Sequence, residues 1–353
     1  MTRAVLIASG GTGGHMFPAT ALGAALERRG HAVRYAVDRR GVRYLEPDAR
    51  HFVVPAASPS GSLVRRVFGL ATLAAGLVLS LARLALQRPA AVAAFGGYAA
   101  VPAGVAAGLL GVPLVLHEQN AVLGRAHRLL LRFADRVATS FPETRGVPAG
   151  KASDLVGNPV RAAFHHVAAP PPRAGVQLLV VGGSQGARVF ADILPAAIGR
   201  LAPATRARLT VVQQCRPEDL ERVERAYAEL GVAAELAAFF DDMPARLAAA
   251  DLVVSRAGAS AVAEILLVGR ASVLVPYPHA ADDHQRANAR ALDAAGAAVA
   301  VDPAEATAER LAAVLDELVG DAPRLAGMAA AARGLARADA AERLADRMED
   351  VGR

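Results

Sequence analysis

The sequence predicts an α/β fold made of two Rossmann-like, doubly wound domains. Short apolar runs end in glycine-rich turns and are followed by helical patterns, which is typical of a parallel sheet covered by helices. The strand, glycine loop and helix pattern occurs twice, as AVLIASGGTGGH at residues 4–15 and QLLVVGGSQGAR at residues 177–188. A chain of 353 residues also exceeds what one hydrophobic core usually organises, so two domains are expected.

The predicted strands are short apolar runs that follow one another along the chain. They lie at residues 4–8, 91–95, 113–116, 177–181, 252–254 and 272–275. Glycine-rich or proline-containing turns separate these strands from the helical patterns that follow. The spacing therefore predicts a buried parallel sheet in each half of the chain.

A proline cluster marks the boundary between the two halves. GNPVR at residues 157–161 is followed by Pro170, Pro171 and Pro172, so a linker is expected near residues 157–175. We expect an N-terminal domain over residues 1–160 and a C-terminal domain over residues 161–336. A polar last helix, within residues 337–353, is expected to pack back on the first domain.

Composition and charge exclude several classes of protein. Hydrophobic residues make up 54% of the chain, which excludes disorder as its main state. The net charge of +6 comes almost entirely from arginine, and no basic run is interleaved with aromatic residues, so nucleic acid is not expected as a partner. A positive surface is compatible with anionic phospholipid or a phosphorylated substrate. The single cysteine, Cys215, cannot form an internal disulfide and indicates a reducing compartment.

Two uncharged stretches, residues 67–82 and 89–116, raise the question of a membrane span. Prolines and the pair Gly96 and Gly97 divide the second stretch into strand, loop and helix pieces, so we expect no transmembrane helix there. The first apolar run of the chain ends in glycines too early for a signal-peptide core. The chain is therefore expected to start as a strand in the cytoplasm.

Both glycine loops are suited to binding phosphate. Glycine lets the backbone approach a ligand closely, and the following helix N-terminus offers unpaired N–H groups and the positive end of its dipole. The P-loop pattern is absent because Lys151 stands outside the required spacing, which excludes nucleotide hydrolysis by that route. The dinucleotide pattern fails because Met16 occupies the third glycine position, although Asp38 leaves a nicotinamide cofactor as an alternative.

Seven motifs in a fixed order carry a resemblance to a known family. They are GGTGGHMFPA at residues 10–19, FGGY at 95–98, HEQNAVLG at 117–124, VGNPVR at 156–161, GGSQGA at 182–187, SRAGASAVAE at 255–264 and ADDHQRANA at 281–289. In this order and spacing the chain closely resembles the MurG family of peptidoglycan N-acetylglucosaminyltransferases. The resemblance covers nearly the whole chain and implies a GT-B fold, with the two domains facing a cleft.

The resemblance implies an inverting transferase that moves N-acetylglucosamine from UDP-GlcNAc to the C4 hydroxyl of MurNAc in undecaprenyl-pyrophosphoryl-MurNAc-pentapeptide, which turns lipid I into lipid II. It implies UDP-GlcNAc, lipid I and an anionic phospholipid surface as partners, and leaves other cell-wall synthesis proteins open. No cofactor is expected. The location implied is peripheral, on the cytoplasmic face of the cell membrane. Another GT-B transferase with a different lipid acceptor, a nicotinamide dehydrogenase and a two-lobed binding protein without catalysis remain as alternatives.

The family's donor contacts can be carried over to matching positions here. The implied UDP-GlcNAc-binding residues are Thr12, Gly13, Gly14, Asn120, Arg161, Ser184, Phe240, Ala259, Ser260, Ala261, Val262, Ala263, Glu264 and Gln285. Helix amides near Ala259 suit a diphosphate, and a carboxylate such as Glu264 can accept two ribose hydroxyl protons. Ala261 stands where relatives often carry Thr, so Ser260 or helix amides are expected to replace that hydroxyl.

The reaction needs a base for the acceptor hydroxyl and a positive environment for the departing diphosphate. His15, at the end of the first glycine loop, is the favoured base, and Glu118 is the competing one. Gly96, Gly97 and Tyr98 are the implied acceptor contacts. No D-x-D motif or other metal-ligand set is visible, so the site is expected to be independent of metal.

The segment over residues 62–88 is apolar and is bracketed by arginines. Arg65 and Arg66 stand near its start, and Arg83 and Arg88 stand near its end. An apolar helical face with flanking cations is typical of an interfacial helix, which predicts docking to the bilayer. A core helix packed on the sheet is the alternative, and both can hold on opposite faces.

Overall fold

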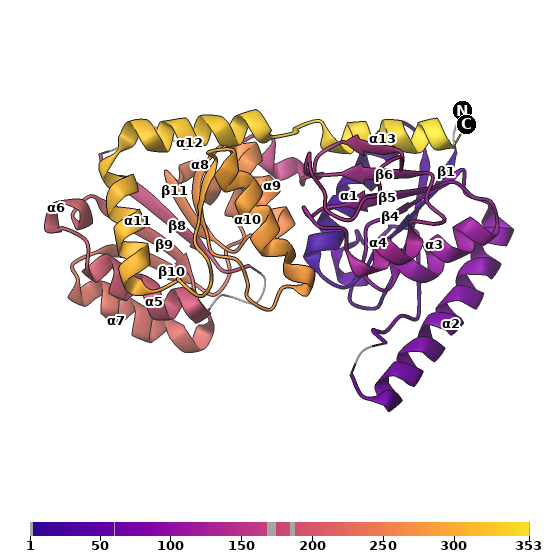
Figure 1. Cartoon of the computed structure of the whole chain (residues 1–353), viewed down its shortest axis with the longest axis horizontal. Coiled ribbons are helices and arrows are strands. Elements are labelled where there is room, and N and C mark those ends of the chain that lie inside the picture. Colours follow the sequence, from indigo (N-terminus) through magenta and orange to yellow (C-terminus); the bar gives the residue numbers. More distant parts are fainter. Residues whose placement is uncertain (1–2, 60, 168–173, 184–187, 353) are drawn as a thin grey trace. The chain divides into compact units, whose positions relative to one another are not determined.

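The chain forms two compact α/β units, as the sequence predicts. The computed structural model describes residues 3–59, 61–167, 174–183 and 188–352. Unit 1 contains Met1–Arg161 and Arg337–Arg353, and unit 2 contains Ala162–Ala336 (Figure 1). The chain crosses into unit 2 after Arg161, one residue later than the expected boundary.

Unit 1 is built on a parallel sheet with strand order β3-β2-β1-β4-β5-β6-β7. Its strands are β1 (Ala4–Ala8), β2 (Ala32–Val37), β3 (His51–Val53), β4 (Ala91–Ala94), β5 (Leu114–Glu118), β6 (Arg136–Thr139) and β7 (Ser153–Leu155). Its helices are α1 (Gly13–Arg28), α2 (Leu63–Gln87), α3 (Ala100–Leu109), α4 (Arg125–Leu130) and α13 (Ala340–Val351).

The central strands of unit 1 are covered on both faces. Side chains of alternate strand residues meet α1 and α13 on one face and α2, α3 and α4 on the other, because successive residues of a strand point to opposite sides. This explains why β1, β4 and β5 are almost continuous runs of buried Ala, Val, Ile and Leu.

Unit 2 repeats this plan with strand order β10-β9-β8-β11-β12-β13. Its strands are β8 (Val176–Val181), β9 (Leu209–Gln214), β10 (Ala233–Ala237), β11 (Leu252–Ser255), β12 (Ala271–Leu274) and β13 (Ala298–Ala300). Its helices are α5 (Arg188–Gly199), α6 (Pro203–Arg206), α7 (Leu220–Glu229), α8 (Met243–Ala249), α9 (Ala259–Val268), α10 (His284–Ala294), α11 (Ala308–Gly320) and α12 (Ala322–Leu335). Short 3-10 turns lie at Val42–Tyr44, Ala162–Phe164, Pro217–Asp219 and Ala281–Asp283.

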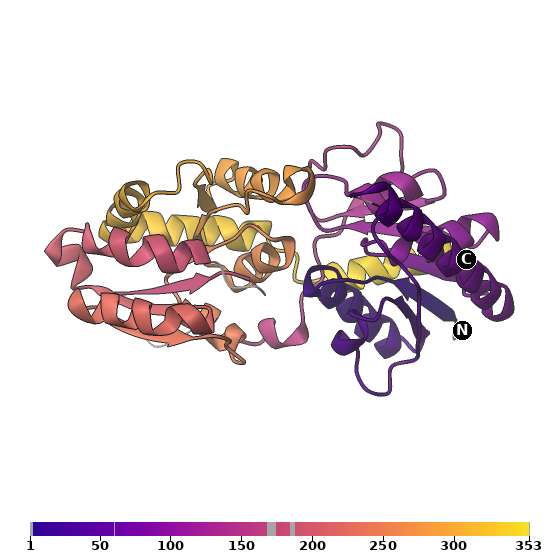
Figure 2. The same ribbon diagram turned by 90° about the horizontal axis from the view of Figure 1, so that it is seen from below.

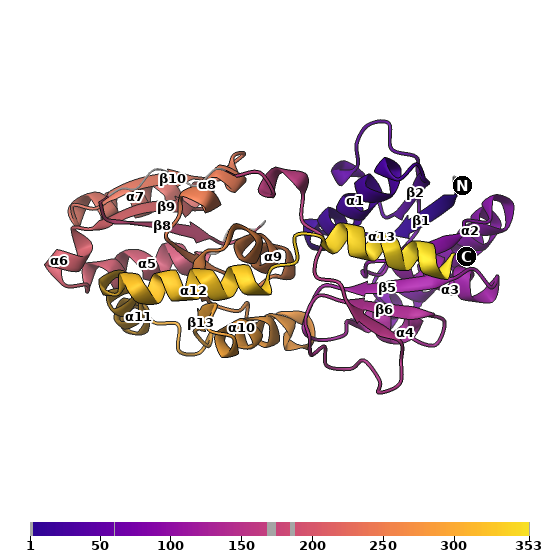
Figure 3. The same ribbon diagram turned by 90° about the horizontal axis from the view of Figure 1, so that it is seen from above.

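One face of the second sheet buries its core against α5, α7, α11 and α12. The helices α8, α9 and α10 cover the opposite face, as right-handed crossovers between parallel strands require (Figure 3). The first glycine loop follows the central strand β1, and Gly182 and Gly183 follow the central strand β8, each at the carboxyl end of its sheet.

The last helix, α13, packs on unit 1. Leu344, Ala345 and Met348 are buried in the core beside α1, and Arg29 at the end of α1 forms ion pairs with Glu342 and Asp346, each at 2.7 Å (Figures 1 and 3). The two ends of the chain meet in this unit, where Arg3 Nη1 donates a hydrogen bond to the Gly352 carbonyl at 2.8 Å (Figure 2).

Candidate active site

The strand order of unit 1 changes direction between β1 and β4, and the loops that follow these two strands meet there. Ligands of doubly wound sheets bind at such a switch point, beyond the carboxyl ends of the strands. Gly96 and Gly97 adopt φ values of 93° and 72° after β4, and a Cβ added at Gly97 would lie only 3.0 Å from the Gly10 carbonyl oxygen. The two loops pack closely because glycine occupies both turns.

Asp38, at the end of β2, holds the first glycine loop in place. Its Oδ1 accepts hydrogen bonds from the backbone N–H groups of Gly11 at 2.9 Å and Gly41 at 2.8 Å. The carboxylate is thus engaged with backbone, which gives it a structural role in place of the ribose contact that a nicotinamide site would need. Thr12 occupies the N-cap position of α1 without a side-chain cap, and Gly13 and Gly14 begin its first turn.

His15 lies in the first turn of α1 and is half-buried. A Cβ added at Gly96 would lie 3.3 Å from His15 Nε2 and Cδ2, so the ring rests directly on the glycine turn after β4. The structure therefore brings the favoured base next to Gly96 and Gly97, two of the three implied acceptor contacts. Tyr98, the third, is half-buried in the same turn.

Glu118, the competing base, ends β5 and is only 2% exposed. Its Oε1 accepts from the backbone and side-chain amides of Asn120 at 3.0 and 3.1 Å. Its Oε2 accepts from the Gly124 N–H and from His127 Nδ1, both at 2.8 Å. Burial alone would raise the pKa of Glu118, but these donors and the charge of His127 outweigh it and lower the pKa to about 2.

His117 and Gln119 form a second buried network beside Glu118. His117 Nε2 lies 2.9 Å from the Gly157 carbonyl oxygen, and its Nδ1 lies 3.2 Å from Gln119 Nε2. Gln119 also donates to the Phe95 carbonyl at 2.9 Å. Burial lowers the pKa of His117 to about 4, so the ring is neutral and donates to Gly157 through Nε2. This network fixes the turn of VGNPVR to the sheet.

Arg161, expected in the second domain, packs on unit 1. Its guanidinium lies over the Phe17 ring, with 4.2 Å between the guanidinium carbon and the ring centroid. Phe17 belongs to α1, two residues after His15. A cation is thus held on the helix that carries the favoured base.

In unit 2 the expected donor residues other than Phe240 lie after β8, β11 and β12, three neighbouring strands. The segment Ala259, Ser260, Ala261, Val262, Ala263 and Glu264 forms the first two turns of α9, after Gly258 at its N-cap. Val262 is buried in the core, whereas Ser260 and Glu264 are half-buried. Ser184, expected in the loop after β8, lies outside the described residues.

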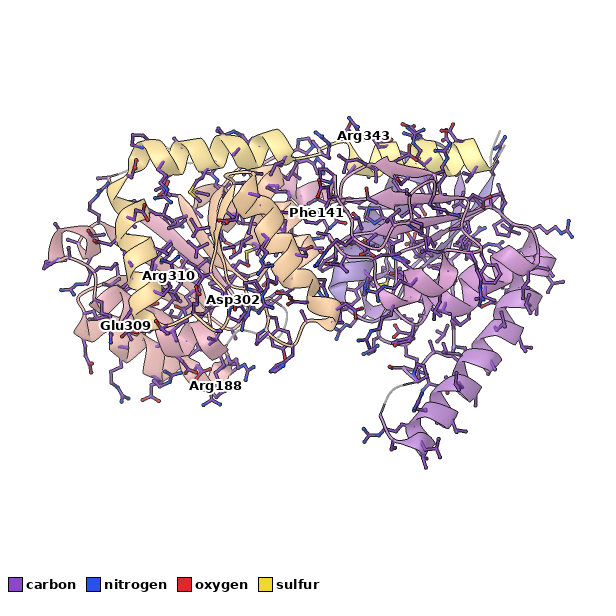
Figure 4. The ribbon with its side chains drawn as sticks, viewed as in Figure 1. Phe141, Arg188, Asp302, Glu309, Arg310 and Arg343 are labelled. Carbon is purple, nitrogen blue, oxygen red and sulfur yellow. The ribbon has the colours of Figure 1, made fainter. Side chains whose placement is uncertain are left out.

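Gln285, in the first turn of α10, lies next to the start of α9. Its Oε1 accepts from the Tyr277 N–H at 2.9 Å, and a Cβ added at Gly258 would lie 3.9 Å from its Nε2. The neighbouring Arg286 holds α10 through ion pairs to Asp283 at 2.7 Å and to Asp302 at 3.0 Å, whose position Figure 4 shows. The side-chain amide of Gln285 is thereby held beside the α9 N-terminus.

Two side chains within the matched motifs support this donor region, although sequence patterns did not single them out. Asn288 is fully buried and donates to the Ala257 carbonyl at 3.0 Å, which ties α10 to the loop before α9. Arg256 donates to the carbonyls of Val275 and Pro276 at 3.1 and 2.8 Å. Asparagine in a helix and arginine after a strand are too common for their spacing alone to reveal these roles.

Phe240 lies after β10 and is 5% exposed, with its ring packed under Arg246 at 4.0 Å. Its side chain is therefore part of the core, and its backbone is the part left for a ligand. The adjacent Phe239 is 71% exposed. An exposed aromatic ring beside the expected uracil position offers a flat apolar surface.

The helix α2 divides the apolar segment of residues 62–88 between two environments. Leu84 is buried, and Leu77 and Leu81 pack against the core, whereas Val64, Val67 and Phe68 are at least 60% exposed. Arg65 and Arg66 are exposed among them. Of the described residues, only α2 is long and apolar enough to span a membrane by length and composition. One part of α2 is therefore a core helix, and the exposed apolar part leaves docking to the bilayer as a prediction.

Comparisons with known proteins agree with this architecture. Residues 5–139 match the Glycosyltransferase family 28 N-terminal domain, and residues 177–344 match the Glycosyltransferase family 28 C-terminal domain. A UDP-N-acetylglucosamine--N-acetylmuramyl-(pentapeptide) pyrophosphoryl-undecaprenol N-acetylglucosamine transferase from a Methylobacterium species is 49% identical, over 97% of this chain and 95% of the relative. The transferase of the same name from Paramagnetospirillum magneticum is 46% identical over the same shares.

A solved structure matches the fold of this chain over nearly its full length. The crystal structure of Acinetobacter baumannii MurG superposes with a TM-score of 0.83 at 30% sequence identity, covering 99% of each chain. The resemblance and the GT-B fold that the motifs predicted are thereby confirmed. The chain belongs to glycosyltransferase family 28 and, within it, to the MurG family of N-acetylglucosaminyltransferases.

Proposed function

We propose that this chain transfers N-acetylglucosamine from UDP-GlcNAc to the C4 hydroxyl of MurNAc in lipid I, with His15 as the general base. Membership of the MurG family supports the reaction and both substrates. The position of His15 in the first turn of α1, against Gly96, is the observation that carries the assignment of the base. Lipid II and UDP are the products.

The chemistry is a single displacement at the anomeric carbon. The C4 oxygen of MurNAc bonds to C1 of N-acetylglucosamine while its proton passes to the His15 imidazole, and the bond from C1 to the UDP oxygen breaks with inversion. The electron pair leaves on the diphosphate. The N-terminal amides of α9, Ser260 and Arg161 supply the positive environment that stabilises it.

Glu118 has a positioning role in this proposal. Four hydrogen bonds engage its two oxygens, and its lowered pKa keeps it ionised but a weak proton acceptor. It orients Asn120, which together with Gln285 recognises the hydroxyls of the donor sugar. Glu264 binds the ribose, the Phe240 backbone meets the uracil, and Thr12, Gly13, Gly14 and Ser184 complete the donor contacts. Gly96, Gly97 and Tyr98 contact the acceptor.

We place the protein at the cytoplasmic face of the membrane, bound peripherally through α2. The exposed apolar side chains Val64, Val67 and Phe68 lie on either side of the exposed cations Arg65 and Arg66 in the sequence. Apolar side chains that enter the headgroup region beside cations favour a bilayer with anionic lipid. The acceptor itself is a membrane lipid, so this docking would bring unit 1 to its substrate.

Thermal shift tests the donor assignment. UDP-GlcNAc should raise the melting temperature, because a ligand that binds only the folded state stabilises it. The shift should be much smaller for Glu264→Ala, since a lost charged hydrogen bond weakens binding by about 10- to 100-fold. Glu229→Ala, which removes an exposed carboxylate of α7, is the matched control. Stabilisation by NAD and none by UDP-GlcNAc would overturn the assignment.

A further inference from the structure

A histidine that the reaction scheme leaves unused, His127, lies directly behind the expected acceptor turn. It belongs to α4 and is 2% exposed. Its Nδ1 lies 2.8 Å from Glu118 Oε2, and its Nε2 lies 3.2 Å from the Ala94 carbonyl oxygen. A Cβ added at Gly96 would lie 3.5 Å from His127 Cε1 and 3.3 Å from His15 Nε2, so the two rings flank the same glycine.

The partners of His127 decide which of its nitrogens carry protons. A backbone carbonyl accepts hydrogen bonds and never donates them. Glu118 already accepts three hydrogen bonds from the N–H groups of Asn120 and Gly124, which favour its ionised form. Both ring nitrogens of His127 therefore face acceptors. A neutral imidazole carries one N–H and would leave one of these contacts as two facing lone pairs, which is costly in a buried site.

The neighbouring His117 has the opposite arrangement. One of its nitrogens faces a carbonyl and the other faces the Gln119 amide, which donates. A neutral ring satisfies both contacts there. Two buried histidines within one network thus require different numbers of protons. The titratable groups near His127 are Glu118, His117 and, across Gly96, His15.

We propose that His127 is a positioning residue for the transfer reaction, held as a buried imidazolium that bridges the Glu118 carboxylate and the Ala94 carbonyl. The bridge joins the carboxyl ends of β4 and β5. It fixes the Gly96 turn against which His15 rests, and through Glu118 it fixes Asn120 and Gly124. This role rests on the function proposed above and adds to it a residue that touches neither substrate.

The protonation state can be measured without any substrate. In protein labelled with ¹⁵N-histidine, nitrogen NMR should show both His127 nitrogens protonated near neutral pH, with the signals assigned by their loss in His127→Gln. His117 serves as the internal control and should show one protonated and one bare nitrogen. A bare nitrogen on His127 would overturn the proposal.

Kinetics separate positioning from simple packing. His127→Leu keeps a side chain of similar volume but removes both N–H donors. Because the loops at the ends of β4 and β5 then lose their alignment, kcat should fall about tenfold or more. The affinity for UDP should stay unchanged. His127→Gln restores one donor to Glu118 and should recover part of the loss. A Leu variant with wild-type kcat contradicts the proposal.

Leu130→Ala is the matched control. Leu130 is fully buried in the same helix but packs against Gly104 of α3. The cavity should lower the melting temperature and leave the kcat of the folded protein unchanged. An equal loss of kcat in Leu130→Ala would mean that any disturbance of α4 impairs the site, and would also contradict a specific role for His127. Failure of the wild-type enzyme to transfer sugar would refute the proposed function instead, while the NMR result still decides the state of His127.

Discussion

At the residue scale, three buried or half-buried histidines and one carboxylate surround the switch point of unit 1. His15 rests on Gly96 from α1, and His127 approaches the same glycine from α4. His117 is tied to Gly157, and Glu118 to four donors. Of these four side chains, His15 is half-buried, whereas His117, Glu118 and His127 are buried. This distribution is why we assign proton transfer to His15 and positioning to Glu118.

Replacing His15 tests the assignment of the base. His15→Ala should lower kcat by about 100- to 10,000-fold, the usual contribution of a general base, and change the affinity for UDP little. Steady-state transfer assays and calorimetry with UDP measure the two quantities. His166→Ala, at an exposed position of unit 2, is the control and should behave as wild type. Unchanged turnover in His15→Ala would remove it from the base role.

The buried carboxylate Glu118 predicts a pH-dependent stability. Its folded pKa of about 2 lies below the ordinary value of 4.5, so it stabilises the fold above pH 4.5 and loses this effect as the pH falls toward 2. Glu118→Gln should lower the free energy of unfolding by about 3 kcal/mol at neutral pH, because a buried cation is left without its partner.

Urea unfolding at several pH values checks this expectation. The difference between wild type and Glu118→Gln should narrow as the pH falls below about 4.5. Glu229→Gln, which alters an exposed carboxylate, should show no comparable difference at any pH. A gap for Glu118→Gln that stays constant down to acid pH would mean that the carboxylate is not stabilised as an anion.

At the element scale, α2 combines a core helix and an exposed surface. Gly76 lets the Pro55 carbonyl approach the helix closely, and Leu84 is buried against unit 1. Most of the exposed apolar side chains lie in the first turns of α2, at Leu63, Val64, Val67, Phe68 and Leu70, and Val78 and Leu86 are exposed further along. An apolar helix surface of this kind is costly in water unless a lipid or protein covers it.

The two parts of α2 should respond differently to substitution. Phe68→Asp should reduce co-sedimentation with vesicles that contain anionic lipid and leave the melting temperature nearly unchanged. Leu84→Ala should lower the free energy of unfolding by about 2–5 kcal/mol, because it opens a cavity in the core. Leu109→Asp alters an exposed apolar residue of α3 and controls for the added charge. Wild-type vesicle binding by Phe68→Asp would argue against docking through this end of α2.

The six predicted strands are all present, with ends that differ by one or two residues, as with β12 at Ala271–Leu274. Their apolar runs are continuous and largely buried, which makes the strand pattern easy to recognise. The other described strands, β2, β3, β6, β7, β9, β10 and β13, are not among these six. Two of them, β3 (His51–Val53) and β7 (Ser153–Leu155), have three residues each, lie at a sheet edge and are partly exposed. Such strands are set by pairing with a neighbour and not by their own apolar pattern.

The candidate site was predictable to a similar extent. The first glycine loop, His15, Glu118 and Gln285 stand in distinctive motifs, and the structure places them at the carboxyl ends of the sheets. The roles of Asp38, His127 and Asn288 were not predictable, because each depends on a backbone group that is distant along the chain. The expected domain boundary placed Arg161 in the second domain and Phe17 in the first. The stacking of Arg161 on Phe17 was therefore not predicted, because the two residues are also distant along the chain.

At the scale of the whole molecule, each unit carries a different part of the groups that the proposed reaction needs. Unit 2 carries the helix N-terminus and side chains suited to a sugar nucleotide, and unit 1 carries the base, the acceptor turn and the exposed part of α2. Neither unit alone holds all the groups that the displacement requires. The activity should therefore be a property of the complete chain.

Direct observation of transfer tests this account most sharply. The protein is mixed with UDP-GlcNAc and a lipid I analogue, and the products are separated and weighed by mass spectrometry. We predict a lipid-linked disaccharide with the mass of one added N-acetylglucosamine, together with an equal amount of UDP. In His15→Ala the formation of both products should fall together. Donor turnover with a diacylglycerol acceptor but none with the lipid I analogue, or tight UDP-GlcNAc binding without any disaccharide, would contradict it.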